Sequence, residues 1–419
     1  MRAPALPAKG MRFLFLTEYF YPEVGAAQAR LGSLVETLKR KGHDIEVVTA
    51  MPHHLTGQIF VGYRTSIYRC EDYKGITIHR TWILASQGTG LRRLLGYISF
   101  ALTSLLGLFR CRRPDVVFVE SPPLFLGIPA WLYARPRRIP IVFNVADLWP
   151  DAIKDLGVTN NRLLLGVAGA LERWVYSKAA IINGITDGVY RTLLERKNIP
   201  RARLLLLPNG VDIRLFVPQP PDEMLSRTIN PEGKHVLLYA GTHGIAHGME
   251  VILEAAKQLQ NEAILFLLVG GGSAKAKLVD YARRQHLRNV KFIDPVPQDK
   301  LPAYYSLAAA SLVSLKISDT SLNVRPAKMF ASLASGVPVI YSGEGEGADL
   351  LRQADAGVVT APGDVRELAD AIQLLCHDGA ARQKFGANGR AFVAREFSWD
   401  HIISRWLEDL TFSLEHTKT

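Results

Sequence analysis

The sequence predicts an α/β protein made of two doubly wound domains that face each other across a cleft. Short, continuously apolar segments of strand length alternate with segments of helix length, a pattern typical of parallel sheets covered by helices on both faces. The alternation pauses at 216–234, a stretch rich in proline and polar residues, and then begins again. A chain of 419 residues also exceeds one ordinary core, so two domains are expected.

The composition is that of a folded protein, with 48% apolar and 21% charged residues. Cys70, Cys111 and Cys376 are far apart in the sequence and match no metal or redox spacing, which indicates a reducing compartment. A net charge of +11 suggests nucleic acid, an anionic membrane or a phosphorylated substrate as a partner. The sequence contains no nucleic-acid-binding signature, so the last two are favoured.

The first domain is predicted over 11–215, after an arm at 1–10 that lacks the apolar core of a signal peptide. A helix is expected to end near Lys41, with Gly42 after it. The buried strands are predicted at 11–17, 44–49, 76–80, 116–120, 141–144, 180–182 and 204–207.

The second domain is predicted over 235–398, with 216–234 as the linker between the two. Its strands are expected at 236–240, 264–269, 290–293, 311–315, 337–341 and 357–359, and one of its helices at 248–260. The last segment, 399–419, contains an amphipathic helix that is expected to pack back on the first domain.

One helix of the second domain is expected to begin at Pro326 and to end at Gly336, because Pro favours helix starts and Gly favours the position after the end. Arg325 and Lys328 lie at its start, where ordinary helix electrostatics disfavours cations. They suggest a bound anion such as a diphosphate. The alternative is a pair of surface-exposed basic residues beside a core helix.

Glycine-rich loops follow three of the predicted strands: one at Gly25, one at 241–248 (GTHGIAHG) and one at 270–272 (GGG). Glycine lets the backbone approach a phosphate or a sugar closely. None of the loops matches G-x-G-x-x-G, so the sequence does not indicate dinucleotide binding. Each loop alone is equally consistent with a tight strand-to-helix turn.

Two carboxylates follow buried strands, Glu120 in VESPP and Asp147 in ADLWP. At the carboxyl ends of parallel strands they would orient sugar hydroxyls or stabilise positive charge. For Asp147, capping of the next helix is an alternative. His53 and His54 are adjacent in a loop and receive no role.

A helix beginning near residue 91 carries no charge from Leu94 to Phe109, and arginines flank the run at Arg92, Arg93, Arg110, Arg112 and Arg113. The run is shorter than the roughly 18–20 residues that span a bilayer. It is either a buried core helix or a helix in a membrane interface, where arginines contact anionic head groups.

Several motifs together carry a resemblance that covers nearly the whole chain from Met11: LTEYFYPEVG, VESPP, VADLWP, LERWVYSKA, LPNGVD, YAGTHGIAHGMEVILEAA, LLVGGG, RNVKFIDPVP and RPAKMFASLASGVPVI. In this order they resemble glycosyltransferase family 4, whose members are retaining enzymes with the GT-B fold of two Rossmann-like domains. The resemblance is to the branch that builds O-antigen, capsule and exopolysaccharide, including colanic-acid and fucosamine-type transferases.

The resemblance implies a role for each matching position. The catalytic region would contain Asp147 beside the transferred sugar, Glu120, and the Gly25 loop near the diphosphate. The donor would be bound by Gly241, Thr242, His243, Gly244, His247, Gly271, Val296, Pro297 and Lys328, with Ala331 at the ribose position. Arg325 is added as a donor-binding candidate because it lies at the same helix start, and Glu344 because it is one of the acids nearest to Ala331 in the sequence. The membrane and acceptor side would be formed by Arg92, Arg93, Arg112 and Arg113. No metal ion and no cofactor are expected.

Members of the family usually carry two glutamates eight residues apart, and the second one holds the ribose hydroxyls. This chain departs from that pattern. Ala331 and Asn323 stand at these positions, and His247 replaces a usual glutamine. Loss of a carboxylate that holds two hydroxyls is worth about 2–4 kcal/mol of binding. Glu344 and Glu346 are the nearest substitutes in the sequence.

The expected function is therefore transfer of a sugar, with retention, from a UDP-linked nucleotide sugar to a polyprenyl-diphosphate-linked saccharide. The expected place is the cytoplasm, peripherally on the inner face of the cell membrane, with no nucleic-acid partner. The alternatives are an impaired or non-catalytic nucleotide-sugar-binding homologue and a sugar-nucleotide epimerase of the same fold.

Overall fold

The structure is a computed structural model that describes residues 10–53, 57–86, 91–149, 161–230, 232–318 and 321–416. The chain forms two compact units. Unit 1 contains the described residues up to Glu23, Ala27–Pro208 and the chain from Ile402 on, and unit 2 contains Val24–Ala26 and Asn209–His401. His54 lies outside the described residues.

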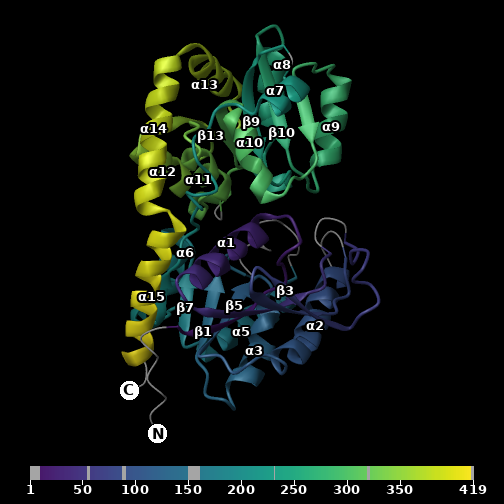
Figure 1. Cartoon of the computed structure of the whole chain (residues 1–419), viewed down its shortest axis with the longest axis vertical. Coiled ribbons are helices and arrows are strands. Elements are labelled where there is room, and N and C mark those ends of the chain that lie inside the picture. Colours follow the sequence, from purple (N-terminus) through teal and green to yellow (C-terminus); the bar gives the residue numbers. More distant parts are fainter. Residues whose placement is uncertain are drawn as a thin grey trace. The chain divides into compact units, whose positions relative to one another are not determined.

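Unit 1 is built on a sheet of order β3-β4-β2-β1-β5-β6-β7-β8 (Figure 1). Its strands are β1 (Arg12–Leu16), β2 (Asp44–Ala50), β3 (Tyr68–Tyr73), β4 (Ile76–Thr81), β5 (Val116–Ser121), β6 (Ile141–Val145), β7 (Ile181–Gly184) and β8 (Leu204–Leu206). Its helices are α1 (Ala26–Arg40), α2 (Leu91–Leu108), α3 (Gly127–Ala134), α5 (Arg162–Lys178) and α6 (Asp187–Glu195). Every strand pair is parallel except β3 with β4.

The edge strand β3 was not predicted from the sequence. Its segment, YRCEDY, has no apolar run, because only one edge of the strand is paired and most of its side chains are exposed or half-buried. Lys74 and Gly75 form the two-residue turn to β4, both with positive φ, as a hairpin turn requires. The sheet is therefore mixed at this edge rather than wholly parallel.

Unit 2 contains a wholly parallel sheet of order β11-β10-β9-β12-β13-β14. Its strands are β9 (His235–Ala240), β10 (Ile264–Val269), β11 (Val290–Ile293), β12 (Ala308–Ser314), β13 (Val339–Ser342) and β14 (Gly357–Thr360). Its helices are α7 (Glu223–Ile229), α8 (Glu250–Gln258), α9 (Lys275–Arg284), α10 (Leu301–Ser306), α11 (Ala327–Ala334), α12 (Glu346–Ala354), α13 (Val365–His377) and α14 (Gly379–Glu396).

Strand β9 shows why the strands of unit 2 are continuously apolar. Val236, Leu238 and Ala240 pack into one core cluster, and Leu237 and Tyr239 pack into another. Successive side chains of a strand point to opposite faces of the sheet, so both faces are covered. The two doubly wound sheets confirm the predicted α/β fold class.

The stretch 216–234 is not a linker, which corrects the expectation from its composition. It lies inside unit 2, where Phe216 and Ile229 are buried in the core. Asp222 caps α7 by accepting a hydrogen bond from the Leu225 N–H, 2.9 Å away. Proline-rich composition predicted a flexible segment, but the buried apolar residues at its two ends fix it to the domain.

The C-terminal helix α15 (Trp399–His416) joins unit 1 from Ile402 on. Its Trp406 is buried, and the indole ring lies about 6 Å from the rings of Phe13 and Phe118. The indole N–H donates a hydrogen bond to Asn183 Oδ1 at 3.2 Å. The last helix therefore completes the core of the first domain.

Candidate functional site

The loop after β9 begins the candidate site of unit 2. It runs from Gly241 to Gly248 and lies at the carboxyl end of the sheet, where ligands of doubly wound folds bind. The Gly241 N–H donates to Val269 O at 2.9 Å, and the His243 N–H donates to Gly271 O at 2.8 Å. These bonds fix the loop to the glycine loop that follows β10.

The glycines of that second loop are required by close packing. A Cβ atom on Gly270 would lie 1.9 Å from Gly241 O, and one on Gly272 would lie 2.6 Å from His243 O. Both residues also have a positive φ, near +150°, which glycine adopts at little cost. The glycine-rich sequence therefore serves loop–loop packing at this edge of the sheet.

Lys328 lies in the first turn of α11 and reaches back to the loop after β9. Its Nζ donates to the Tyr239 hydroxyl at 2.5 Å, and a Cβ on Gly241 would lie 3.0 Å from its Cε. Pro326, which precedes α11, provides no side-chain cap. The helix N-terminus, its positive dipole end and an ammonium group thus lie beside the Gly241 loop, an arrangement suited to an anion.

Two histidines in this loop are held neutral. His243 is fully buried, and neither of its ring nitrogens has a hydrogen-bond partner among the residues that the structure describes. Burial, with Lys275 and Lys328 nearby, lowers the pKa of His243 to about 4. Burial and Lys328 likewise lower the pKa of His247 to about 3. The two imidazoles are therefore uncharged at neutral pH, and positive charge beside this loop comes from the neighbouring lysines.

Arg325 does not form the cationic pair with Lys328 that its sequence position suggested. Its Nη2 makes an ion pair with Glu346 Oε2 at 2.8 Å, and both side chains are largely buried. Glu346 is the first residue of α12, so the pair fixes α12 to the start of α11. Glu344, in contrast, is exposed.

Ala331 lies one helical turn after Lys328, on the same side of α11. Its side chain is half-buried and packs against the core. Asn323 ends a short 3₁₀ turn before the helix. The structure thus leaves a methyl group at the position where the family resemblance implies a carboxylate.

The remaining candidate donor residues lie on neighbouring loops. Val296 and Pro297 follow β11, the strand that pairs with β10. A Cβ on Gly271 would lie 2.9 Å from Pro295 Cγ, so the loops after β10 and β11 are in contact. Thr242 and Gly244 belong to the loop after β9. All these residues therefore gather along one edge of the unit 2 sheet.

In unit 1, the candidate acids lie at the ends of two paired strands. Glu120 in β5 is opposite Asn144 in β6, and its Oε2 accepts a hydrogen bond from Asn144 Nδ2 at 3.0 Å. Its Oε1 makes a buried ion pair with Arg30 Nη1 at 2.8 Å. Asp147 follows β6. The residue as a whole is exposed, but burial of its carboxyl group raises the pKa of Asp147, and nearby Arg30 opposes the rise. Glu120 is thus held on both oxygens, and Arg30 also lies near Asp147.

Arg30, on α1, was not identified from the sequence. It is buried, and its Nε and Nη2 have no hydrogen-bond partner. Although burial raises the pKa of Glu120, Arg30 and Asn144 oppose this increase. The guanidinium group therefore offsets part of the desolvation cost of this buried carboxylate, and the pKa of Glu120 stays raised.

His53 also acquires a setting that the sequence did not suggest. His53 Nε2 lies 3.3 Å from Glu18 Oε1, and the backbone N–H of His53 donates to Glu23 Oε1 at 2.7 Å. Burial lowers the pKa of His53, but the two glutamates outweigh burial and raise it overall. Glu18 follows β1 and His53 follows β2. These positions, just after buried strands, were the only feature of the sequence that could have predicted that the two side chains meet.

The arginines that flank α2 have different surroundings. Arg93 donates to the hydroxyls of Tyr97 and Tyr19, at 2.6 and 3.2 Å. Arg112 pairs with Glu46 and Asp44, and Arg113 donates to Arg137 O. Arg92 is exposed. Three of the four candidate membrane arginines are therefore engaged within unit 1.

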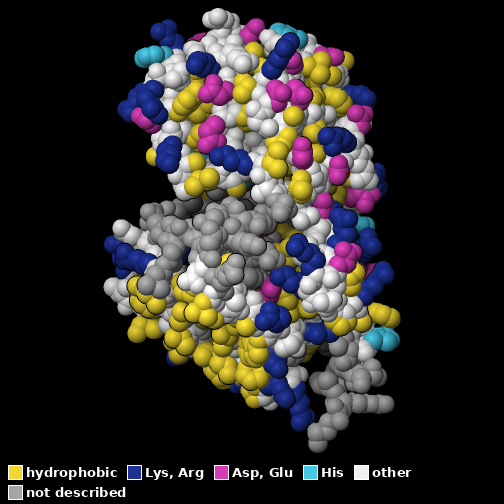
Figure 2. All heavy atoms as spheres, turned by 180° about the vertical axis from the view of Figure 1, so that it is seen from behind, with side chains coloured by type: hydrophobic (Ala, Val, Ile, Leu, Met, Phe, Trp, Pro, Cys, Tyr) yellow, Lys and Arg dark blue, Asp and Glu magenta, His cyan; other side chains and the backbone are white. Residues whose placement is uncertain are grey.

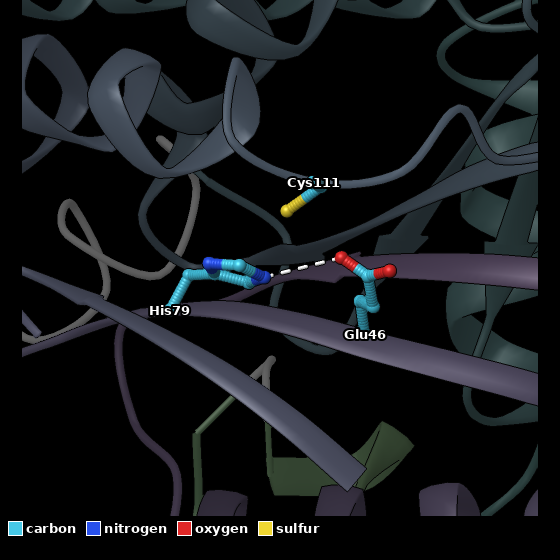
Figure 3. A group of neighbouring side chains, drawn as sticks. All are labelled: Glu46, His79 and Cys111. Carbon is cyan, nitrogen blue, oxygen red and sulfur yellow. Dashed lines mark hydrogen bonds and ion pairs between the residues drawn. The ribbon is translucent and has the colours of Figure 1, made fainter. Parts of the chain in front are cut away.

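Figure 3 shows a buried group of possible metal ligands, Glu46, His79 and Cys111, whose ligand atoms lie within 4.8 Å of one another. The carboxylate of Glu46 is already occupied by His79 Nε2 at 3.1 Å and by Arg112 Nε at 2.6 Å. Burial would raise the pKa of Glu46, but these hydrogen bonds lower it to about 2. Burial also raises the pKa of Cys111, which keeps the thiol protonated. The group is therefore better explained as an ion-paired contact between β2 and the segment that follows α2 than as a metal site.

Comparisons with known proteins agree with this arrangement. Residues 25–210 match a family model described as "Glycosyl transferase 4-like domain", and residues 222–392 match "Glycosyl transferases group 1". The chain is 28% identical over 342 residues to WcaI of Escherichia coli strain K12, a protein named for glycosyl transfer in colanic acid biosynthesis. That match covers 80% of this chain and 84% of WcaI.

Solved structures share the fold at low sequence identity. The sucrose-phosphate synthase of Thermosynechococcus elongatus superposes with a TM-score of 0.73 at 18% identity, over 96% of this chain and 99% of that one. Anabaena HepE in complex with UDP-glucose gives a TM-score of 0.71 at 16% identity, with the same two coverages. Together, the two family matches, the relative and the shared fold show that the chain belongs to glycosyltransferase family 4 and has the GT-B fold.

Proposed function

We propose that the protein transfers a sugar, with retention, from a UDP-linked nucleotide sugar to a polyprenyl-diphosphate-linked saccharide during surface polysaccharide synthesis. The observation that carries the proposal is the start of α11, where Lys328 and an uncapped helix N-terminus lie beside the Gly241 loop. HepE, a protein of the same fold, is described in complex with UDP-glucose. WcaI supports the polysaccharide context by its name.

The donor is proposed to lie along the carboxyl edge of the unit 2 sheet. Its diphosphate would contact Lys328 and the backbone from Gly241 to Gly244, with neutral His247 as a possible hydrogen-bond donor. Its base would lie near Gly271, Val296 and Pro297, on loops that contact one another. Arg325 would act indirectly, because its ion pair with Glu346 fixes the start of α11.

The proposed reaction forms a bond from an acceptor hydroxyl oxygen to the anomeric carbon and breaks the bond from that carbon to the diphosphate. The acceptor's proton would pass to the leaving phosphate oxygen on the same face. Lys328 and the N–H groups of α11 would stabilise the charge that develops on the leaving group, so the proposal requires neither a metal ion nor a cofactor.

In unit 1 we assign Asp147 to the neighbourhood of the transferred sugar, because it follows the carboxyl end of β6, where ligands of doubly wound folds bind. Glu120 would position Arg30 and Asn144 and not contact the sugar, since both of its oxygens are occupied. The Gly25 loop, directly before α1, would approach the diphosphate.

The lipid-linked acceptor places the proposed reaction at the inner face of the cell membrane, with the protein bound peripherally from the cytoplasm. In the part of the chain that the structure describes, no helix is long and apolar enough to cross a bilayer. Binding would therefore use a surface of the protein, with anionic lipids as its partner.

A second candidate function is favoured by one observation, the missing carboxylate at Ala331. The family pattern also has a glutamate where this chain has Asn323. A homologue that lacks both glutamates would bind a nucleotide sugar without transferring it. The two functions predict different products from the same incubation, so they can be separated directly.

The test incubates the full chain with a panel of UDP-sugars and a polyprenyl-diphosphate-linked saccharide. Products are analysed by mass spectrometry, and the anomeric configuration is determined by NMR. We expect one UDP-sugar to give a product with retained configuration, and EDTA to leave the rate unchanged. Lys328→Ala is the matched loss-of-function control, and its fold is checked by circular dichroism.

Binding is measured in parallel by calorimetry. Binding of a UDP-sugar without transfer or donor hydrolysis, for every acceptor tested, would identify the non-catalytic candidate. An inverted product would refute the retaining mechanism, and equal activity of Lys328→Ala would refute the assigned diphosphate site.

A further inference from the structure

Helices α2, α3 and α5 form one layer on a single face of the unit 1 sheet. Helix α2 connects β4 to β5, α3 connects β5 to β6, and α5 connects β6 to β7. All three connections run in the same direction across the sheet. Right-handed crossovers in one direction place their helices on the same face. Helix α2 contacts α3, and α3 contacts α5. Their outward sides therefore make up one surface of the unit.

Figure 2 shows hydrophobic side chains gathered over this part of unit 1. We call this surface the apolar face, and it consists of the exposed residues Leu95, Ile98, Leu102, Phe109, Leu132, Leu163, Leu164 and Val167. The exposed fractions are high, 66% for Leu102 and 75% for Leu163. Soluble surfaces rarely gather so many large apolar side chains in one place without a partner.

Helix α2 is apolar on two sides. Tyr97, Phe100 and Leu108 are buried in the core, while Leu95, Ile98 and Leu102 form an exposed stripe at helical spacing. The sequence predicted either a core helix or a membrane-interface helix for this segment. One side of α2 packs in the core, and the other side is exposed and apolar. The first half of α5 adds Leu163, Leu164 and Val167 to the exposed apolar residues, and Val175, farther along the helix, is buried.

The charge around the apolar face has one sign. The sequence has no Asp or Glu in 91–114, 121–146 or 161–171. Arginines lie at the ends of the helices, and Arg92, Arg110, Arg135 and Arg138 have exposed side chains. In these segments an apolar surface with a cationic border matches the interface of an anionic bilayer.

The same charges disfavour a second copy of this chain as the occupant. A two-fold dimer through the apolar face would bring the surface against itself. The arginine border would then meet arginines, with no carboxylate from these segments to pair with them. Anionic head groups provide the missing negative charge.

We propose that the apolar face docks unit 1 on an anionic membrane, with the outward sides of α2 and α5 in the interface and the exposed arginines at the head groups. This inference rests on the proposed function, because a lipid-linked acceptor requires the enzyme at the bilayer. It adds α5 to the contact, and it adds the exposed residues Arg110, Arg135 and Arg138 to the candidate membrane arginines.

The test is flotation of the full chain with vesicles of phosphatidylcholine alone or with 30 mol% phosphatidylglycerol, a proportion of roughly one anionic lipid in three chosen for strong surface charge. We expect flotation with the anionic vesicles and at least a tenfold lower partition coefficient for Leu102→Ser/Leu163→Ser/Val167→Ser. Val61→Ser/Met224→Ser is the matched control, because both residues are exposed apolar residues outside the apolar face. It should float like the wild type.

A second variant, Arg110→Ser/Arg135→Ser/Arg138→Ser, should lose the preference for phosphatidylglycerol. Equal flotation of the apolar triple variant and the wild type would overturn the proposal. So would a dimer, seen by sedimentation, that the apolar triple variant converts to a monomer. Circular dichroism verifies that each variant is folded.

Transfer assays keep this inference separable from the proposed function. With a short-chain acceptor in free solution, the apolar triple variant should transfer sugar as fast as the wild type. With an acceptor embedded in vesicles, it should be at least tenfold slower. A wild type that floats but transfers nothing would refute only the function, and one that transfers without floating would refute only the docking surface.

Discussion

The ammonium group of Lys328 lies 2.5 Å from the hydroxyl of Tyr239 and 3.9 Å from the centre of the same aromatic ring. No carboxylate of the described residues is within ion-pair distance of it, and burial lowers the pKa of Lys328 to about 7. Burial also raises the pKa of Tyr239, so the hydroxyl stays neutral. In the free protein, the Lys328 side chain is therefore only partly protonated at neutral pH.

The first prediction is that donor binding takes up a proton. A diphosphate favours the charged form of Lys328, so its pKa rises above 7 in the complex. Affinity for a UDP-sugar, whose diphosphate stays ionised, should be constant well below pH 7 and fall by up to about tenfold per pH unit above it. Calorimetry in two buffers with different ionisation enthalpies measures the proton uptake directly.

Lys328→Arg is the control for this pH dependence, because a guanidinium group stays charged at every accessible pH. The variant should bind with an affinity that changes little between pH 6 and pH 9, a range of about three units around the pKa of the lysine. Proton uptake of the same size in Lys328→Arg would assign the titration to another group.

A second prediction concerns Ala331→Glu. The new carboxylate would lie one helical turn from Lys328, where the family resemblance implies a contact with the ribose hydroxyls. It should strengthen UDP binding by at least tenfold, because a hydrogen bond to a charged group contributes about 1.5–3 kcal/mol. Ala331→Gln controls for the size of the side chain, and unchanged affinity of both would indicate that the ribose binds elsewhere.

Local signals allowed prediction of much of the fold. Pro326 and Gly336 bracket α11 as expected, because both act through the backbone of the helix itself. The composition of 216–234 predicted a linker, and this prediction was wrong. Two buried apolar residues and a helix cap fix the stretch to unit 2 despite its prolines. The edge strand β3 was missed because an exposed strand needs no apolar run.

The candidate site was predictable only in part, because its partners are distant in sequence. Lys328 was identified from its helix, but Tyr239 is 89 residues away. Arg325 was expected to be available for an anion, and its pairing with Glu346 depends on how α12 packs. Arg30, 90 residues before Glu120, carries no signal of its own in an amphipathic helix.

A third prediction tests the buried ion pair of Arg30 and Glu120, whose side chains are 6% and 5% exposed. Glu120→Leu leaves an unpaired buried guanidinium group and should destabilise unit 1 by about 3–5 kcal/mol, and Arg30→Met should act similarly. The double variant should be less destabilised than either single variant. Urea unfolding followed by tryptophan fluorescence reports on unit 1, which holds five of the six tryptophans. Additive losses would show that the two groups do not interact.

The last prediction concerns Trp406, which attaches the C-terminal helix to the core of unit 1. Its indole is 1% exposed, lies against Phe13 and Phe118, and donates to Asn183 Oδ1. Trp406→Ala should cost about 3–5 kcal/mol, because it leaves a large cavity, and Trp406→Phe about 1–3 kcal/mol, because the amide oxygen loses its donor. Phe412→Ala, on the same helix but 64% exposed, should stay within about 0.5 kcal/mol of the wild type. Circular dichroism in urea measures all three, and a Trp406→Ala protein as stable as Phe412→Ala would show that the helix is not part of the cooperative core.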